Sequence, residues 1–493
     1  MKIIALLYID INLTDADLTF KSFYLPEELK SRVLSAGLCA EVKYSAHNSY
    51  SGKLKGNDVY LREDNDDVAF WKRFFSETQA DHIVKIFCDS PFADMDIIAD
   101  MLNVHTKYLA EFTYSENLPA GYACEIISKE LINALPDTEE KTLPLGQVIR
   151  SNINKFDVEL YYREPDIRDK RILFRCGNPR EKRILENIYV KAAKIPRYSE
   201  VKNIIDGNPD ILYLWPSYAE IELTGRCDLD CIFCYRKALK TEHGDMDTGL
   251  FKKILSDLSS AGLPYSVCFG GSGEPLMHKN FYEILDLSRN ERFIENIIIE
   301  TNGILAGANY RNYLITVKDR RIKTIFNING MDAESYKTIH KGNFFNTVFQ
   351  NITSLKEAIS GDDSLYIQIM KINETEAFLD KFYDFWEKYK IPIILQKQNT
   401  FLGKIEDRSY SDLSPLERTP CWHLQRDFNV LSDGTAMFCK QDVDGQFARG
   451  NLNNESISEL FMKSKNSFLN DYRKNYAASP DCASCGEWYT FNL

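Results

Sequence analysis

Three cysteines within eight residues are the most reactive feature of this sequence. Cys227, Cys231 and Cys234 follow the short run 221–225 in a CxxxCxxC arrangement. Thiolates at this spacing can bind three irons of a four-iron, four-sulfur cluster and leave the fourth iron without a protein ligand. Cubane clusters that only carry electrons normally take four cysteines, whereas a metal that does chemistry keeps one coordination position open. The triplet therefore predicts a cluster that binds a further ligand.

A second group of cysteines lies near the C-terminus. It consists of Cys421, Cys439, Cys482 and Cys485. The stretch 431–439 predicts a hairpin that delivers one of them, and four cysteines complete one cubane without an open iron. A zinc site is the alternative for this group, because four cysteines that end in CxxC also suit zinc. For the first triplet zinc would need a fourth ligand, which the triplet lacks. His423 is expected to be an ordinary loop residue.

Composition limits the class of protein. A chain of 493 residues predicts about three domains. The net charge of -12 argues against nucleic acid or an anionic membrane as the main partner. No stretch approaches the roughly 20 apolar residues that span a bilayer, and the run 1–9 is better explained as a buried strand than as an export signal. Cysteine clusters without such a signal predict a reducing, cytoplasmic location.

The cysteine triplet, with Phe233 before its last member, resembles the signature of the radical S-adenosylmethionine (SAM) enzymes. The resemblance implies that the open iron chelates SAM, and that one electron then cleaves SAM to a 5'-deoxyadenosyl radical that abstracts hydrogen from a substrate. The C-terminal segment, including 450–461, resembles the SPASM domains of such enzymes. Only eight residues follow Cys485, so this resemblance implies one auxiliary [4Fe–4S] cluster.

The middle of the chain alternates between strand and helix patterns. The predicted strands are 219–223, 265–269, 296–300, 323–328, 365–370 and 392–395. Six strand–helix units over 217–410 agree with the partial (β/α)6 TIM-type barrel that the resemblance implies. In parallel α/β barrels functional groups lie at the C-terminal ends of the strands. The cysteine triplet follows the first of these strands, as that rule requires.

Two further motifs follow predicted strands. The segment 270–276 resembles the glycine-glycine-glutamate motif of the family, which implies that Gly271, Gly273 and Glu274 hold the amino group of SAM. The segment 300–303 is similar to the ribose-binding segment, to which Thr301 and Asn302 would contribute hydrogen bonds. A glycine run and an Asn-Gly pair are also ordinary turn sequences. Their position after strands favours the functional interpretation.

Other polar residues lie on or near the predicted strands. Asn327 follows the fourth strand, where relatives often carry serine, and is included among the SAM-binding residues. Gln368 either points into the barrel or is a satisfied core residue. His278 and His340 are predicted to be solvent-exposed, and Cys268 to be a packed thiol. No general base can be identified.

Residues 1–200 predict a parallel-sheet α/β domain. The strands 3–9 and 80–87 alternate with the helices 26–36 and 95–107. The stretches 80–94 and 118–130 resemble cytidylyltransferases, in which two carboxylates bind magnesium. Asp89 matches one of them and Gly177 stands near the other, although Asp89 is expected to be a turn or capping residue. No glycine precedes Gly37, so the phosphate-binding loop is missing. This predicts the nucleotidyltransferase-like fold without the activity.

The order of a nucleotidyltransferase-like domain, a radical SAM core and a SPASM/twitch-like domain at 411–493 resembles the spiro-SPASM proteins. It implies an α/β enzyme that cleaves SAM and abstracts hydrogen from a peptide, protein or sugar-type substrate. A reducing partner such as flavodoxin or ferredoxin is expected. Two alternatives stay open: a cytidylyltransferase acting on a sugar, and a zinc-stabilised binding protein.

Overall fold

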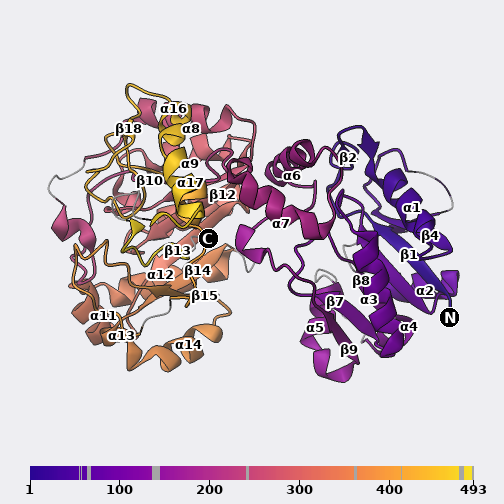
Figure 1. Ribbon diagram of the computed structural model, residues 1–493. Coiled ribbons are helices and arrows are strands. Elements are labelled where there is room, and N and C mark those ends of the chain that lie inside the picture. Colours follow the sequence, from indigo (N-terminus) through magenta and orange to yellow (C-terminus); the bar gives the residue numbers. More distant parts are fainter. Residues whose placement is uncertain are drawn as a thin grey trace. The chain divides into compact units, whose positions relative to one another are not determined.

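The computed structural model describes residues 1–490 except 55, 57, 64–67, 136–144, 240–243, 360–363, 412–413 and 477–481. The chain divides into two compact units, Met1–Leu212 (unit 1) and Tyr213–Leu493 (unit 2), which Figure 1 shows in indigo to magenta and in magenta to yellow. Among the described helices, none is both long and apolar enough to cross a membrane.

Unit 1 is built on a seven-stranded sheet in the order β5-β4-β1-β6-β8-β7-β9. Its strands are β1 (Ile3–Tyr8), β4 (Glu41–His47), β5 (Val59–Arg62), β6 (His82–Phe87), β7 (Phe112–Ser115), β8 (Glu125–Ser128) and β9 (Val158–Tyr161), and β2 (Thr19–Phe20) and β3 (Phe23–Tyr24) form a separate hairpin. Most pairings in this sheet are parallel, as expected, but β8 runs antiparallel to β6 and β7. The connection 116–124 is too short for the crossover of a dozen or more residues that parallel neighbours need.

Helices cover this sheet. They are α1 (Leu25–Ser35), α2 (Val68–Thr78), α3 (Met95–Lys107), α4 (Lys129–Ala134), α5 (Leu145–Ser151), α6 (Pro179–Ala192) and α7 (Tyr198–Gly207). Sequence signals start several of them: the Asp94 side chain caps α3, and Asn178 caps α6 ahead of Pro179. The aromatic face of α2 packs Trp71 and Phe74 into the core beside β1. Burial of that face fixes α2 on the sheet.

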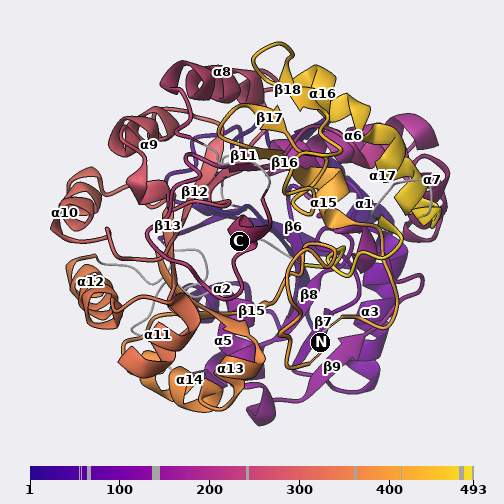
Figure 2. The same ribbon diagram turned by 90° about the vertical axis from the view of Figure 1, so that its left-hand side faces the viewer.

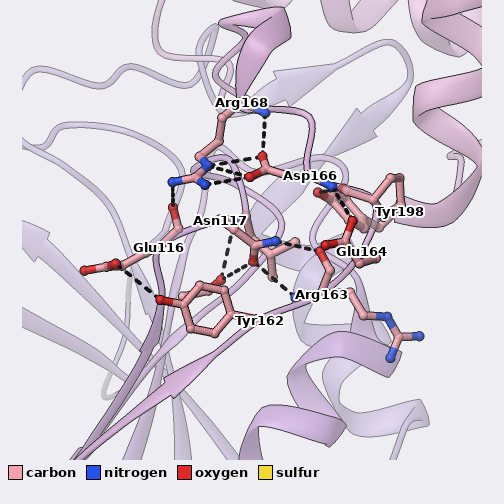
Figure 3. Close-up of polar contacts among 11 residues, drawn as sticks. Glu116, Asn117, Tyr162, Arg163, Glu164, Asp166, Arg168 and Tyr198 are labelled. Carbon is pink, nitrogen blue, oxygen red and sulfur yellow. Dashed lines mark hydrogen bonds and ion pairs between the residues drawn. The ribbon is translucent and has the colours of Figure 1, made fainter. Parts of the chain in front are cut away.

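The irregular stretch after β9 is tied to the turn after β7 (Figure 3). The Asn117 side chain donates to the carbonyl of Arg163 at 2.8 Å and accepts from its N–H at 3.1 Å. Arg168 binds Asp166 through a short ion pair of 2.6 Å, and the Tyr198 hydroxyl donates to the carbonyl of Pro165 at 2.6 Å. These contacts fix the path of the chain from β9 toward α6 and α7.

Unit 2 contains the expected partial barrel. Its six parallel strands are β10 (Tyr218–Ile221), β11 (Tyr265–Phe269), β12 (Ile294–Thr301), β13 (Ile322–Asn327), β14 (Leu365–Lys371) and β15 (Ile393–Lys397), in sequence order. The helices are α8 (Thr248–Ser259), α9 (Phe281–Arg289), α10 (Ala308–Val317), α11 (Ala333–His340), α12 (Phe345–Ala358), α13 (Asn373–Glu376) and α14 (Leu379–Glu387). Figure 2 shows these helices arranged around the outside of the strands. The prediction of a (β/α)6 architecture is confirmed.

The C-terminal segment continues the same sheet. Strand β16 (Asp427–Val430) pairs in parallel with β10, with Tyr218 opposite Asp427. Strands β17 (Thr435–Ala436) and β18 (Gly450–Asn451) then add antiparallel, and the helices α15 (Trp422–Arg426), α16 (Ile457–Lys463) and α17 (Lys465–Tyr472) complete this part. The predicted hairpin lies between β16 and β17. Its parallel attachment to the barrel was not predicted.

Side-chain alternation along the strands produces two layers inside the barrel. The lower layer is apolar: Tyr218, Cys268, Ile298 and Ile325, with Tyr366 and Ile394 packed against them. Successive side chains of a strand point to opposite faces, so the residue two positions further on also faces inward. That upper layer is mostly polar: Glu220, Gly270, Glu300, Asn327, Gln368 and Gln396. The carboxyl ends of the strands therefore present polar groups above an apolar base.

The buried His105 makes the stability of unit 1 pH-dependent. Its Nδ1 lies 2.8 Å from the Thr113 hydroxyl and its Nε2 lies 2.9 Å from Nδ1 of His82, and burial lowers its pKa to about 4. The unfolded chain binds the proton near pH 6.5, so this stability is complete above pH 6.5 and is lost as the pH falls toward 4. We expect a loss of about 3 kcal/mol over this range in urea unfolding. The variant His105→Gln should lose most of this slope, and Asn103→Ala on the same helix should keep it.

Helix α16 offers a matched test of packing in unit 2. The Phe461 ring is 1% exposed and stacks on Tyr213 with centroids 4.5 Å apart, whereas the adjacent Met462 is 48% exposed. Removal of a buried aromatic ring costs about 3–5 kcal/mol. We expect Phe461→Ala to lower the free energy of unfolding of the apoprotein by this amount, measured by urea denaturation. Met462→Ala should change it by less than about 0.5 kcal/mol, and equal effects would contradict the packing described.

Candidate functional site

One cavity of about 600 Å³ lies within unit 2, at the carboxyl ends of the barrel strands. Both groups of cysteines line it: Cys227, Cys231, Cys234, Cys421, Cys439, Cys482 and Cys485. The residues predicted to bind SAM line it too: Gly271, Gly273, Glu274, Thr301, Asn302 and Asn327. The fold thus brings together all the predicted cluster-binding and SAM-binding residues, from segments that are far apart along the chain.

The three thiols of the first group lie in the loop that follows β10. Its turn is closed by the Cys234 N–H, which donates to the carbonyl of Cys231 at 3.2 Å. Burial raises the pKa of the Cys231 thiol, and the neighbouring thiols of Cys234 and Cys227 raise it further. Thiols this close to one another in a water-poor site stay protonated unless a cation binds them. The loop therefore favours a shared metal centre.

The second group is held by an ion pair. Asp471 accepts from the Cys421 N–H at 2.6 Å and from Arg418 at 3.0 Å, and Arg418 also donates to the carbonyl of Cys482 at 2.7 Å. His423 is not available as a metal ligand, because its ring nitrogens lie 2.6 Å from an Asp427 oxygen and 3.0 Å from the Thr490 hydroxyl. The four cysteines line the same cavity and remain the candidate donors of this group.

The donor sets fit iron–sulfur clusters. Among the described residues, no three Cys, His, Asp or Glu side chains are placed to hold one metal ion. A zinc ion would need four ligands within about 2.3 Å of one point. In a cubane each thiolate binds a different iron, so the sulfurs lie further apart, and thiolate is the ligand that such clusters take. The seven cysteines that line the cavity offer only thiolate ligands, which is the donor set that iron–sulfur clusters take.

The glycine loop after β11 packs tightly on the cysteine loop. A Cβ at Gly273 would lie 1.9 Å from the carbonyl oxygen of Thr224, so only glycine fits there. Gly271 adopts φ +101°, which side chains rarely tolerate. The Glu274 N–H then donates to the carbonyl of Arg226 at 2.7 Å. The close approach aligns the two loops at the cavity wall.

Glu274 joins this loop to the one after β12. Its carboxylate accepts from the Thr301 hydroxyl at 2.7 Å and from the Asn302 N–H at 2.8 Å, and burial raises its pKa to about 7. The Asn302 side chain in turn donates to Asp228 of the cysteine loop at 2.6 Å. Three of the predicted SAM-binding residues therefore form one hydrogen-bonded network that also orients the cysteine loop.

Sequence reasoning missed an ionic group in the upper barrel layer. Lys440, the residue after Cys439, places its Nζ 2.8 Å from a Glu220 oxygen. Burial and the Glu220 charge raise the pKa of Glu300, while the Lys440 ammonium lowers it. Asn327 lies in the same layer and accepts a hydrogen bond from Gln368. The only signal in the sequence was a glutamate two positions beyond an apolar, inward-facing residue in β10 and in β12.

The prediction that two histidines are exposed is wrong. His278 is 3% exposed and contacts the carbonyl of Met246 at 3.0 Å. His340 is 1% exposed; its Nε2–H donates to the carbonyl of Ile328 at 2.8 Å, and its Nδ1 lies 3.0 Å from Sγ of Cys231. Tyr336 and His340, four positions apart on α11, form its buried face. That spacing was the available signal.

The glycine loop offers a matched pair of substitutions. A Cβ at Gly273 would clash with Thr224, whereas a Cβ at Gly270 would meet nothing nearer than 3.6 Å. We expect Gly273→Ala to weaken SAM binding to the reconstituted protein at least tenfold, about 1.4 kcal/mol, because the loop must move away from the cysteine loop. Gly270→Ala should stay within about twofold of wild type. Equilibrium dialysis with labelled SAM measures both, and similar affinities for the two variants would contradict the prediction.

Comparison with known proteins assigns both halves of unit 2. Residues 221–385 match the radical SAM superfamily, and residues 421–486 match SPASM, an iron–sulfur cluster-binding domain. An uncharacterized protein of Treponema pallidum is 25% identical over 363 residues, which are 70% of this chain and 97% of that protein. The tungsten-containing aldehyde ferredoxin oxidoreductase cofactor-modifying protein of Pyrococcus furiosus is 38% identical over 18% of this chain and 24% of its own length. The probable GTP 3',8-cyclase of Methanothermobacter thermautotrophicus is 26% identical over 40% of this chain and 63% of its own length.

Solved structures show partial similarity. Streptococcus suis SuiB bound to precursor peptide SuiA matches with a TM-score of 0.45 and 14% identity, over 62% of this chain and 81% of that chain. BtrN in complex with AdoMet and 2-DOIA matches with a TM-score of 0.38 and 19% identity, over 57% and 99%. The two domain matches imply a [4Fe–4S] cluster with SAM and auxiliary iron–sulfur. The chain therefore contains a radical SAM domain followed by a SPASM domain, and it is an enzyme of the radical SAM type.

Proposed function

We propose that this enzyme removes a hydrogen atom from a substrate that binds in the unit 2 cavity. Cys227, Cys231 and Cys234 hold the cluster that keeps an open iron. When bound, the cluster and SAM supply the electron and the carbon-centred acceptor for this hydrogen atom. The observation that carries the proposal is that both cysteine groups line one cavity at the carboxyl ends of the barrel strands.

The loops after β11 to β13 bind SAM in this proposal. Gly271 and Gly273 let the backbone approach the ligand, and the Glu274 network holds the loop against the next one. Thr301 and Asn302, which line the same cavity, contribute hydrogen bonds to the ribose hydroxyl groups in this proposal. Asn327, in the polar layer, completes the set. The supporting fact is that the loops after β11 and β12 contact each other and the cysteine loop directly.

The C-terminal cysteines hold one auxiliary cluster. Cys421, Cys439, Cys482 and Cys485 provide four thiolates, which complete one cubane and leave no open iron. In this proposal the second cluster accepts an electron from the substrate or orients it, and the support is that these residues line the same cavity as the first triplet. A flavodoxin or ferredoxin would serve as the reducing partner, and thiolate-bound clusters favour a reducing compartment such as the cytoplasm.

The cavity favours substrates that carry hydroxyl, amide or amino groups. Its polar layer holds the carboxylates of Glu220 and Glu300, the ammonium of Lys440 and the amides of Asn327 and Gln368. Buried polar groups need hydrogen-bonding partners, which a polar substrate supplies. A peptide, a protein segment or a sugar-type compound meets this requirement.

Cleavage of SAM tests the assignment of the first cluster. The reconstituted protein with SAM and dithionite should release 5'-deoxyadenosine, measured by liquid chromatography. Cys234→Ala should reduce the product to the level without protein, because the cluster loses one of three ligands. Cys268→Ala, which removes a buried barrel thiol outside the proposed site, is the control and should keep the activity. Product from Cys234→Ala at the wild-type rate would refute the assignment.

Iron content tests the second cluster independently. Each cubane holds four irons, so Cys482→Ala should lower the iron content from roughly eight to roughly four atoms per chain. The first cluster stays in place, and this variant should still cleave SAM without added substrate. Elemental analysis by mass spectrometry measures the iron and zinc content of wild type and of the variant. Zinc in place of the missing iron in wild-type protein would favour the structural-zinc alternative for the C-terminal group.

A further inference from the structure

Two carboxylates meet at the carboxyl edge of the unit 1 sheet. Asp10 follows β1 and Asp89 follows β6, and these two strands are parallel neighbours. Strands β4 and β5 lie on the other side of β1, so the strand order reverses between β1 and β6. In open α/β sheets ligands bind outside the carboxyl ends of the strands at such a point. The two carboxylates therefore stand where this fold presents its binding crevice.

A guanidinium group fills the space between them. Nε of Arg175 donates to Oδ1 of Asp89 at 2.8 Å, and one terminal nitrogen lies 2.6 Å from Oδ2 of Asp10 and 2.7 Å from Oδ1 of Asp89. The other Asp89 oxygen accepts from the Gly177 N–H at 3.0 Å. The Phe87 ring lies under the guanidinium, with the ring centroid 4.0 Å from the guanidinium carbon. Both oxygens of Asp89, which is 1% exposed, are thus occupied by the protein itself.

This arrangement does not fit a magnesium ion. Magnesium binds carboxylate oxygens at about 2.0–2.1 Å, and the guanidinium already holds those oxygens with a charge that would repel the ion. Gly177 stands near the position of the second carboxylate in the cytidylyltransferases that residues 80–94 resemble, and it has no side chain. A Cβ at this position would lie 2.8 Å from a Leu13 methyl carbon and 3.0 Å from Oδ2 of Asp89. A carboxylate cannot be added there without displacing its neighbours.

We propose that Arg175 is a built-in cation that takes the place of a divalent metal in unit 1. The crevice then binds its ligand without metal and does not support metal-dependent nucleotidyl transfer. The cluster of Asp10, Asp89 and Arg175 keeps one net negative charge, which opposes a triphosphate. The adjoining cavity of about 280 Å³, which Asp10 also lines, presents the polar groups of Asn12 and Thr14 and the carboxylate of Asp15. These hydrogen-bonding groups and the second carboxylate suit a ligand that bears hydroxyl groups and no negative charge.

Manganese binding tests this proposal in the full-length protein. Free Mn²⁺ is counted by electron paramagnetic resonance in wild type, Arg175→Met and the control Arg163→Met. Arg163 also pairs with a carboxylate, Asp100, at 3.0 Å, but both side chains are 47% exposed. Loss of Arg175 leaves two carboxylates facing an empty cation position. We expect Arg175→Met to bind one Mn²⁺ at least tenfold more tightly than wild type and Arg163→Met.

Further variants at Asp89 and Arg175 test whether the manganese ion binds at this site. The gain should disappear in the double variant Arg175→Met with Asp89→Asn, because the new site needs the Asp89 charge. Circular dichroism checks folding, and Arg175→Gln replaces Arg175→Met if the latter does not fold. The proposal is overturned if wild type binds Mn²⁺ in a way that Asp89→Asn abolishes. It is equally overturned if the folded Arg175 variants bind no more Mn²⁺ than the control. Neither result bears on SAM cleavage in unit 2.

Discussion

Parallel pairing on both sides of β10 is the constraint on which the unit 2 site depends. Strand β10 pairs with β11 on one side and with β16 on the other, and all three run in the same direction. Their following loops must therefore leave the sheet at one edge. One loop carries the cysteine triplet, the next carries the glycines, and the third leads through a hairpin to Cys439. If β16 paired antiparallel, this hairpin would leave at the opposite end of the barrel.

Buried charge explains why these loops hold their positions. An unpaired charge in a protein interior costs several kcal/mol, so each buried carboxylate needs partners. Glu222 accepts from the N–H groups of Ser272 and Ser432 at 3.1 and 3.3 Å, which joins the glycine loop to the C-terminal hairpin. In the same way, Glu274 joins the glycine loop to the loop after β12. The polar groups of the site are thus also the contacts that align strand ends from distant parts of the chain.

Patterns of short range were predictable, and contacts of long range were not. The six barrel strands were predicted within a few residues, because apolar runs alternate there with amphipathic helices. His340 was misjudged because a histidine at a helix end is exposed or buried according to what packs against that helix. Lys440 was overlooked because charged residues are almost never buried without a partner, and its partner Glu220 lies 220 positions away. Strands β7 and β8 were not predicted, so the short connection that makes β8 antiparallel became evident only in the structure.

The sequence by itself determined the chemistry of this protein. Three thiols within eight residues can converge on one cluster whatever the rest of the chain does, because so short a segment limits how far apart they can lie. Only the tertiary structure decided that the C-terminal cysteines face the same cavity, and that Arg175 lies between Asp89 and Asp10, which are 86 and 165 positions away. Contacts between residues so far apart in the sequence depend on strand order and on the pairing of buried charges. No local pattern of residues encodes either of them.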